Sequence, residues 1–284
     1  MLSGLTSSGV LDPQGPVAHS ERLILFDATV IMLAVIVPVI IAILAVAWWF
    51  RAGNTRAAYR PDWAYSGRLE FIVWSIPALV VLFLGGIAWV SSHDLDPHKP
   101  LAETQPLEIQ VVSLDWKWLF IYPEQGIAGV NRLVVPAGRP LHFKLTSATV
   151  MNSFFVPQLG SQIYTMAGMT TQLHLQADKP GTYPGISAQF SGDGFSDMRF
   201  NVEAVPETDF DKWVDETKAG GQALDYAGLT QNSKADKPAV YRGVEPGLFE
   251  KILDMETEGA EGQQNAPNAT VSPRAPVSPR NGGS

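Results

Sequence analysis

Two long apolar stretches constrain this chain more than any other feature of its sequence. The first covers residues 23–50 with a single charged side chain, and the second covers residues 71–90 with none. A helix needs roughly 20 apolar residues to cross the hydrocarbon core of a bilayer, and such runs are rare in soluble proteins. Pro38 and Pro77 would break helices in water but are tolerated in membrane spans. The sequence therefore predicts a transmembrane hairpin over residues 23–90.

The arginines between the two spans predict the orientation of the hairpin. Residues 51–70 contain four of them: Arg51, Arg56, Arg60 and Arg68. By contrast, only Arg22 stands just before the first span and only Lys99 just after the second. Because short loops rich in Lys and Arg stay in the cytoplasm, we expect a cytoplasmic loop. Both termini then lie on the periplasmic side of a bacterial inner membrane.

Residues 1–22 are expected to form an outer segment before the first span. Met1 to Leu5 are too few for a secretory signal peptide, and they resemble the end of a lipoprotein signal with Leu5 where the acylated cysteine would stand. The chain contains no cysteine, so it offers no disulfide and no thiolate ligand for a metal. Its net charge of −8 argues against a nucleic-acid partner, which requires a basic face.

The chain beyond the spans has the pattern of an exported β domain over residues 91–205. Short β-branched runs such as LEIQVVSL and MRFNVEAV are separated by glycine and proline turns, which is typical of a sandwich or barrel. Residues 206–261 are polar and predict short helices, and residues 262–284 have the composition of a disordered tail. The predicted class is thus a membrane α + β protein.

Three stretches of the β domain are long and idiosyncratic: VVSLDWKWLFIYPEQGI, VMNSFFVPQLGSQIYTMAGM and KPGTYPGISAQFSGDGFSDM. They resemble subunit II of the haem–copper terminal oxidases, and the resemblance extends from about Leu11 to Met255. It implies a cupredoxin-like sandwich. In the cytochrome c oxidases of this family, that sandwich holds a two-copper centre, CuA. Its ligands are two histidines, two cysteines, a methionine and a glutamate carbonyl.

The resemblance places other residues at nearly all of those copper positions. Asn152 and Phe195 stand where the family has histidines, Ser187 and Ser191 where it has cysteines, and Gln189 where it has glutamate. Only the methionine matches, at Met198. Copper requires thiolate and imidazole ligands, and one thioether is a weak substitute. The sequence therefore predicts that these positions bind no metal.

This pattern is similar to the quinol oxidase branch of the family, whose bo-type ubiquinol oxidases also have an aromatic extension like VYRGVEPGLFEKI. The resemblance implies a non-catalytic subunit of a proton-pumping complex. Haems, CuB and ubiquinol would be bound by the large subunit I, with subunits III and IV as further partners. The chain would hold no cofactor and would receive no electrons from cytochrome c.

Glu70 is the residue of the hairpin with the clearest candidate role. An acid in the first turn of a helix is favoured by the helix dipole, which explains Glu70 without any function. However, GRLEFIVWSIP resembles the segment whose glutamate stands at the proton entrance of the K pathway. We therefore expect Glu70 to take up protons. Asp27, near the outer end of the first span, has no partner that the sequence identifies.

No functional role is predicted for four aromatic side chains of the β domain. Trp116 and Trp118 share a strand face by their spacing, which predicts a packed core or a contact with the large subunit. His142 and His174 lie in separate strand patterns, and neither is assigned a role.

Two alternative functions belong to other classes. A membrane-anchored cupredoxin-like electron carrier would need the missing copper ligands. An assembly factor or binding module would use the sandwich outside an oxidase. Purification with or without haem-containing partners distinguishes these alternatives.

Overall fold

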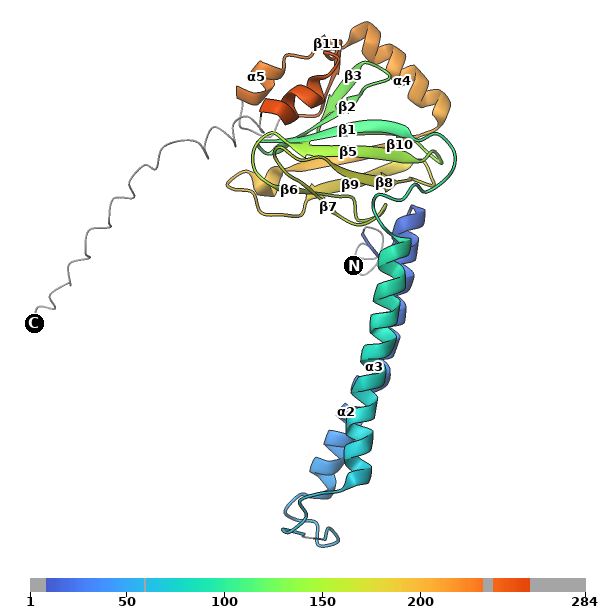
Figure 1. The fold of residues 1–284 in the computed structure, drawn as a ribbon, viewed down its shortest axis with the longest axis vertical. Helices are drawn as coiled ribbons and strands as arrows, with labels where there is room; N and C mark the ends of the chain where they lie inside the picture. The colour runs from blue at the N-terminus through green and yellow to red at the C-terminus, as the bar shows by residue number, and fades with distance from the viewer. Residues whose placement is uncertain (1–8, 59, 232–236, 256–284) are drawn as a thin grey trace, which may run out of the picture.

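The computed structural model describes residues 9–58, 60–231 and 237–255. A β-sandwich stands at one end of a stem made of two long helices, and the loop that joins the helices lies at the far end of the stem (Figure 1). The predicted tail at 262–284 and the segment Met1–Leu5 lie outside the described residues.

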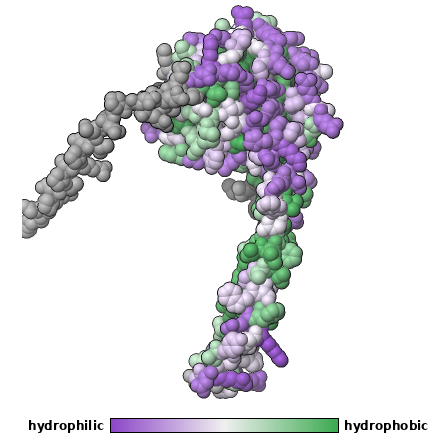
Figure 2. Space-filling view, in the orientation of Figure 1, coloured by the Kyte–Doolittle hydropathy of each residue, from purple (hydrophilic) through white to green (hydrophobic). Residues whose placement is uncertain are grey.

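The stem consists of α2 (Pro16–Trp49) and α3 (Gly67–Asp94), which pack side by side. Helix α2 begins before its predicted span and α3 extends beyond both ends of its own. None of the residues in their most apolar windows is buried within the chain. The apolar middle of the stem is green in Figure 2, and the sandwich surface above it is mainly purple. With a rise of 1.5 Å per residue, α2 is about 51 Å long and exceeds a hydrocarbon core of about 30 Å. The chain is therefore a membrane protein whose helix ends project from the apolar layer.

The sandwich has two sheets, as the sequence predicts. The larger sheet contains, in spatial order, β11 (Gln222–Ala223), β12 (Ala239–Arg242), β3 (Ile127–Val130), β2 (Lys117–Tyr122), β1 (Leu107–Leu114), β5 (Leu141–Ser147) and β8 (Thr171–Leu175). The smaller sheet contains β4 (Arg132–Pro136), β10 (Arg199–Val205), β9 (Gly181–Ser187), β6 (Asn152–Phe155) and β7 (Ile163–Thr165). This arrangement confirms the cupredoxin-like fold class.

An aromatic cluster fills the space between the sheets. Trp118 is fully buried, with its ring 5.6 Å from those of Phe154 and Phe200. Phe154 and Phe200 stack on each other at 5.1 Å. Pairs of this kind add about 0.5–1.5 kcal/mol each to the stability that burial provides. The core thus holds β2, β6 and β10 together, and β6 and β10 flank the loop considered below.

The C-terminal extension contains strands as well as the expected helices. Its helices are α4 (Glu207–Gly220), α5 (Tyr226–Gln231) and residues 248–255. Unlike the prediction, β12 pairs antiparallel with β3, and β11 pairs with β12. These strands are too short to be recognised from their sequence, and β3 supplies the free edge that makes them strands. The buried Lys117 side chain donates to the Leu229 carbonyl at 2.8 Å and fixes the extension to the sandwich.

Candidate functional site

The loop between β9 and β10 contains most of the positions that the sequence identifies as a former copper site. It includes the short helix η1 (Phe195–Asp197). Strand β6 pairs with β9 so that Phe154 faces Ser187. Because the two strands are antiparallel, Asn152 at the start of β6 lies at the same end of the sheet as the loop. The fold therefore brings the predicted positions together.

Asn152 and Ser187 are hydrogen-bonded to each other. The Ser187 hydroxyl donates to Asn152 Oδ1 at 3.1 Å, and Asn152 Nδ2 donates to the Val150 carbonyl at 3.2 Å. Both residues are buried: 4% of the surface of Ser187 and 1% of the surface of Asn152 is exposed. A buried polar group left without a partner costs about 1–3 kcal/mol, so this pair stabilises the loop entrance without an ion.

The remaining positions are occupied by packing contacts. The Phe195 ring meets Phe190 edge to face at 5.6 Å, and Gln189 is half-buried. The Ser191 hydroxyl is buried and has no hydrogen-bond partner among the described residues. Met198 is 1% exposed and belongs to the hydrophobic core. The one retained ligand position therefore points into the core of the sandwich.

The side chains at this site do not fit a copper centre. Two amides, two hydroxyls and a phenyl ring replace the imidazoles, thiolates and glutamate of the family. Soft copper ions select thiolate and imidazole ligands, which neutral amides and hydroxyls do not imitate. Across the described residues, no group of three or more His, Cys, Asp or Glu side chains is placed to hold a metal ion. No electron transfer step is therefore assigned to this loop.

Trp116 packs on the same loop, which the sequence analysis did not predict. It lies in the turn between β1 and β2 with a positive φ of 55°, so it does not share a strand face with Trp118. A Cβ atom on Gly194 would lie 2.3 Å from the Trp116 ring, and one on Gly192 would lie 3.4 Å from it. The glycines on either side of Asp193 therefore make room for the indole, which fixes the loop backbone.

Glu70 lies at the opposite end of the molecule. It is in the first turn of α3, where its amide donates to the Ser66 carbonyl at 3.0 Å. Its side chain is exposed and forms no ion pair with a described residue. Asp27 is also exposed on the stem. The structure thus places Glu70 at the loop end of the hairpin, far from the sandwich (Figure 1).

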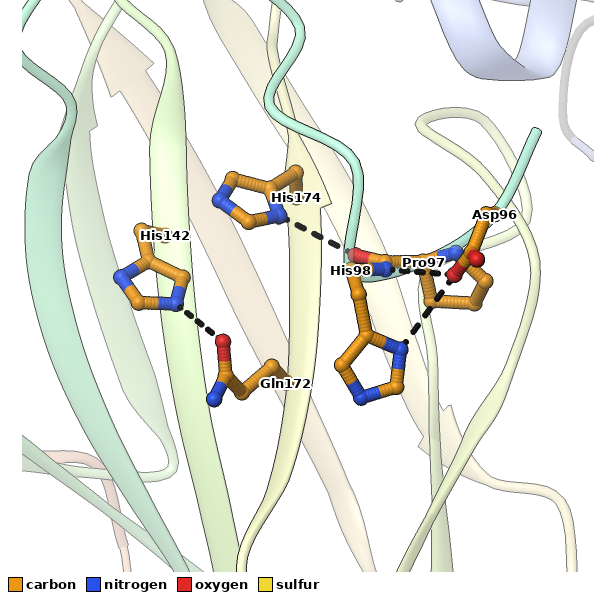
Figure 3. A network of polar contacts seen from close by, with 6 residues as sticks. All are labelled: Asp96, Pro97, His98, His142, Gln172 and His174. Carbon is orange, nitrogen blue, oxygen red and sulfur yellow. Dashed lines mark hydrogen bonds and ion pairs between the residues drawn. The ribbon is translucent and has the colours of Figure 1, made fainter. Parts of the chain in front are cut away.

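Two histidines that lie far apart in the sequence meet beside the junction of stem and sandwich (Figure 3). His142 and His174 are cross-strand neighbours of β5 and β8, and their rings stack at 4.5 Å. The His174 backbone amide and Nδ1 both contact the Pro97 carbonyl, at 3.2 and 3.0 Å. Pro97 lies three residues after Asp94, the last residue of α3, so His174 attaches the end of the stem to the larger sheet. The two strand patterns were visible in the sequence, but their register was not.

The start of α2 forms a second attachment to the sandwich. The Gln14 amide donates to the Gln158 carbonyl at 2.7 Å, and the Gln14 carbonyl accepts from the Asp178 amide at 2.8 Å. A Cβ atom on Gly15 would lie 2.2 Å from the Gln176 carbonyl oxygen, so only glycine allows this approach. The sandwich is thus held at both helices of the stem.

The lowered pKa of His142 predicts that the stability of the sandwich depends on pH. Burial lowers the pKa of His142 below its ordinary value of 6.5, while its hydrogen bond to Gln172 opposes that shift. His174, Glu108 and Lys144 are the charged or titratable groups beside it. Because the unfolded chain takes up a proton at higher pH than the folded chain, the free energy of unfolding should fall as the pH drops through 6.5.

This prediction is checked by urea unfolding of the whole chain in detergent between about pH 7.5 and 5.5. His142→Gln should flatten the decline, because glutamine does not titrate. An identical pH dependence in the wild type and His142→Gln would contradict the assignment.

Comparisons with known proteins agree with this architecture. Residues 124–205 match the family described as cytochrome c oxidase subunit II, periplasmic domain. The chain is 49% identical to cytochrome bo(3) ubiquinol oxidase subunit 2 of Pseudomonas aeruginosa over 89% of this chain and 78% of the relative. It is also 49% identical to ubiquinol oxidase subunit 2 of Acetobacter aceti, over 88% of this chain and 83% of that relative.

One solved structure that matches part of the chain is the periplasmic domain of subunit II of the Bradyrhizobium japonicum cytochrome oxidase. The two chains are 22% identical, the TM-score is 0.40, and the match covers 42% of this chain and 98% of that domain.

Proposed function

The chain belongs to the subunit 2 family of the ubiquinol oxidases, and on this premise we propose that it is the copper-free, non-catalytic subunit of such a complex. The observation that best supports this proposal is the hydrogen bond between Asn152 and Ser187, which stand at the positions of two copper ligands in the family. A loop that holds hydrogen bonds and phenyl rings instead of thiolates supports a scaffold function. The sandwich then packs on its partner and carries no electrons.

The redox chemistry belongs to the partner in this proposal. Ubiquinol delivers electrons directly to the haems and CuB of subunit I, and oxygen is reduced to water there. No electrons come from cytochrome c, and subunits III and IV complete the assembly. This chain contributes its hairpin, its rigidly attached sandwich and a carboxylate at the hairpin loop. The missing copper ligands argue against an electron carrier, and the family membership argues against a separate assembly factor.

The orientation follows from the charges of the hairpin loop. Residues 51–70 carry the four arginines, so we infer that this loop faces the cytoplasm and that the sandwich is periplasmic. Glu70 then lies on the side from which a proton pump takes up protons. A carboxylate exchanges protons with bulk water, and intramembrane or boundary carboxylates frequently serve proton pathways. We infer that Glu70 is the proton entrance of the K pathway.

Purification of the intact complex tests this function. The chain, tagged at its C-terminus and extracted with mild detergent, should copurify with haem-containing partners. The preparation should oxidise ubiquinol with oxygen uptake and should not oxidise reduced cytochrome c. Isolation of the chain without haem would favour the assembly factor, and oxidation of cytochrome c would favour the electron carrier.

A further inference from the structure

A pocket of about 750 Å³ lies at the loop end of the stem. Its wall combines residues from both helix ends and from the loop: Val46, Phe50, Leu69, Arg51, Arg60 and Trp63. The first three are apolar and continue the lipid-facing surface of the stem. The arginines and the indole stand on the loop. One concave surface therefore joins an apolar wall to two cationic groups.

The positive charge of this pocket is not compensated within the described residues. None of the loop arginines forms an ion pair there. Asp62 and Glu70 are the two acidic residues of residues 51–70, and neither lines the pocket. Arg51 donates to the Trp48 carbonyl at 3.2 Å, and its guanidinium lies 5.1 Å from the Trp48 ring centroid. Arg51 is thus held at the end of α2 with other N–H donors still available.

The position of the pocket relative to the bilayer determines what can fill it. The apolar runs end at Phe50 and begin again at Phe71, so the loop begins where the hydrocarbon layer ends. Val46 and Phe50 then lie at the depth of acyl chains, and the two arginines lie at the depth of phosphate groups. Cationic pockets at this boundary recognise anionic headgroups.

We propose that this pocket binds an anionic glycerophospholipid, with its phosphate on Arg51 and Arg60 and an acyl chain along Val46 and Phe50. Guanidinium groups bind phosphate oxygens through paired, charge-assisted hydrogen bonds. A free phosphate ion would leave the apolar wall uncovered, and a zwitterionic lipid would leave the positive charge uncompensated. Glu70 directly follows the wall residue Leu69 but does not itself line the pocket, and the copper-free loop lies at the other end of the molecule.

The test uses the purified oxidase complex in phosphatidylcholine nanodiscs that contain spin-labelled phosphatidylglycerol. Arg51→Gln/Arg60→Gln should remove an immobilised population of the label and weaken its binding about tenfold, because each basic residue near a headgroup contributes several-fold to affinity. Arg56→Gln/Arg68→Gln removes the same charge from the same loop outside the pocket, so it should change binding less than about twofold. Spin-labelled phosphatidylcholine should show no such population in any of the three proteins.

Three results would overturn the proposal. Equal losses in both double variants would mean that the loop attracts lipid only through its total charge. No loss in Arg51→Gln/Arg60→Gln would mean that lipid does not occupy the pocket in the assembled complex. Displacement of the label by millimolar inorganic phosphate would mean that the site binds phosphate without a lipid.

Discussion

Restoring five side chains should give this chain a coloured two-copper centre. The variant combines Asn152→His, Ser187→Cys, Gln189→Glu, Ser191→Cys and Phe195→His. The backbone already brings two of these positions into contact, since Ser187 Oγ lies 3.1 Å from Asn152 Oδ1. Met198 is in place and buried. Thiolates and imidazoles then select copper over the hard cations of the cell.

The restored site should be measured by elemental copper content, visible absorption and the mixed-valence EPR signal. Histidine is larger than the buried Asn152, so an overpacking cost of about 1–3 kcal/mol is expected and should appear in thermal unfolding without copper. Copper binding should recover part of that stability, because an ion that binds only the folded chain stabilises it.

A matched control keeps Ser187 and carries the other four substitutions. With only one thiolate, it should bind copper weakly and show no mixed-valence signal. If the five-fold variant folds and remains colourless, the loop backbone has departed from the geometry that the family uses for copper.

Replacing Glu70 by glutamine should slow ubiquinol oxidation while leaving the complex assembled. Glutamine keeps the size and hydrogen bonding of the side chain but cannot exchange protons. Loss of a positioned proton-transfer group costs about 10²–10⁴-fold in rate when no other route exists. Because bulk water at the membrane surface offers a second, slower source of protons, we expect a decrease of about tenfold. The rate of ubiquinol oxidation is measured as oxygen uptake, with the wild type and the variant compared at equal haem content.

Two further variants separate proton uptake from helix stability. Glu70→Asp retains the acid and should be milder than Glu70→Gln. Asp62→Asn removes the other carboxylate of the hairpin loop and should leave turnover unchanged. If Glu70→Gln assembles with normal haem content and turns over at the wild-type rate, Glu70 only stabilises the start of α3 through the helix dipole.

Local sequence patterns were sufficient for the architecture, and the family resemblance was sufficient to predict the missing copper ligands. The two spans follow from uninterrupted apolar length, and the β domain follows from short alternating runs between glycine and proline turns. Once the family resemblance identifies the positions, the missing ligands at Ser187 and Phe195 follow from residue type, because ligand chemistry depends on it. Each of these conclusions rests on neighbouring residues or on single side chains.

The tertiary structure alone decided the contacts that hold these parts together. His142 stacks on His174 only because β5 and β8 pair in one register, and a shift of one residue would turn these side chains to opposite faces. Trp116 covers the former copper loop through a turn that the strand spacing did not predict. Strand β12 forms because β3 offers an edge. Such contacts join residues distant in the sequence, and strand register and edge exposure arise only when the whole sandwich is assembled.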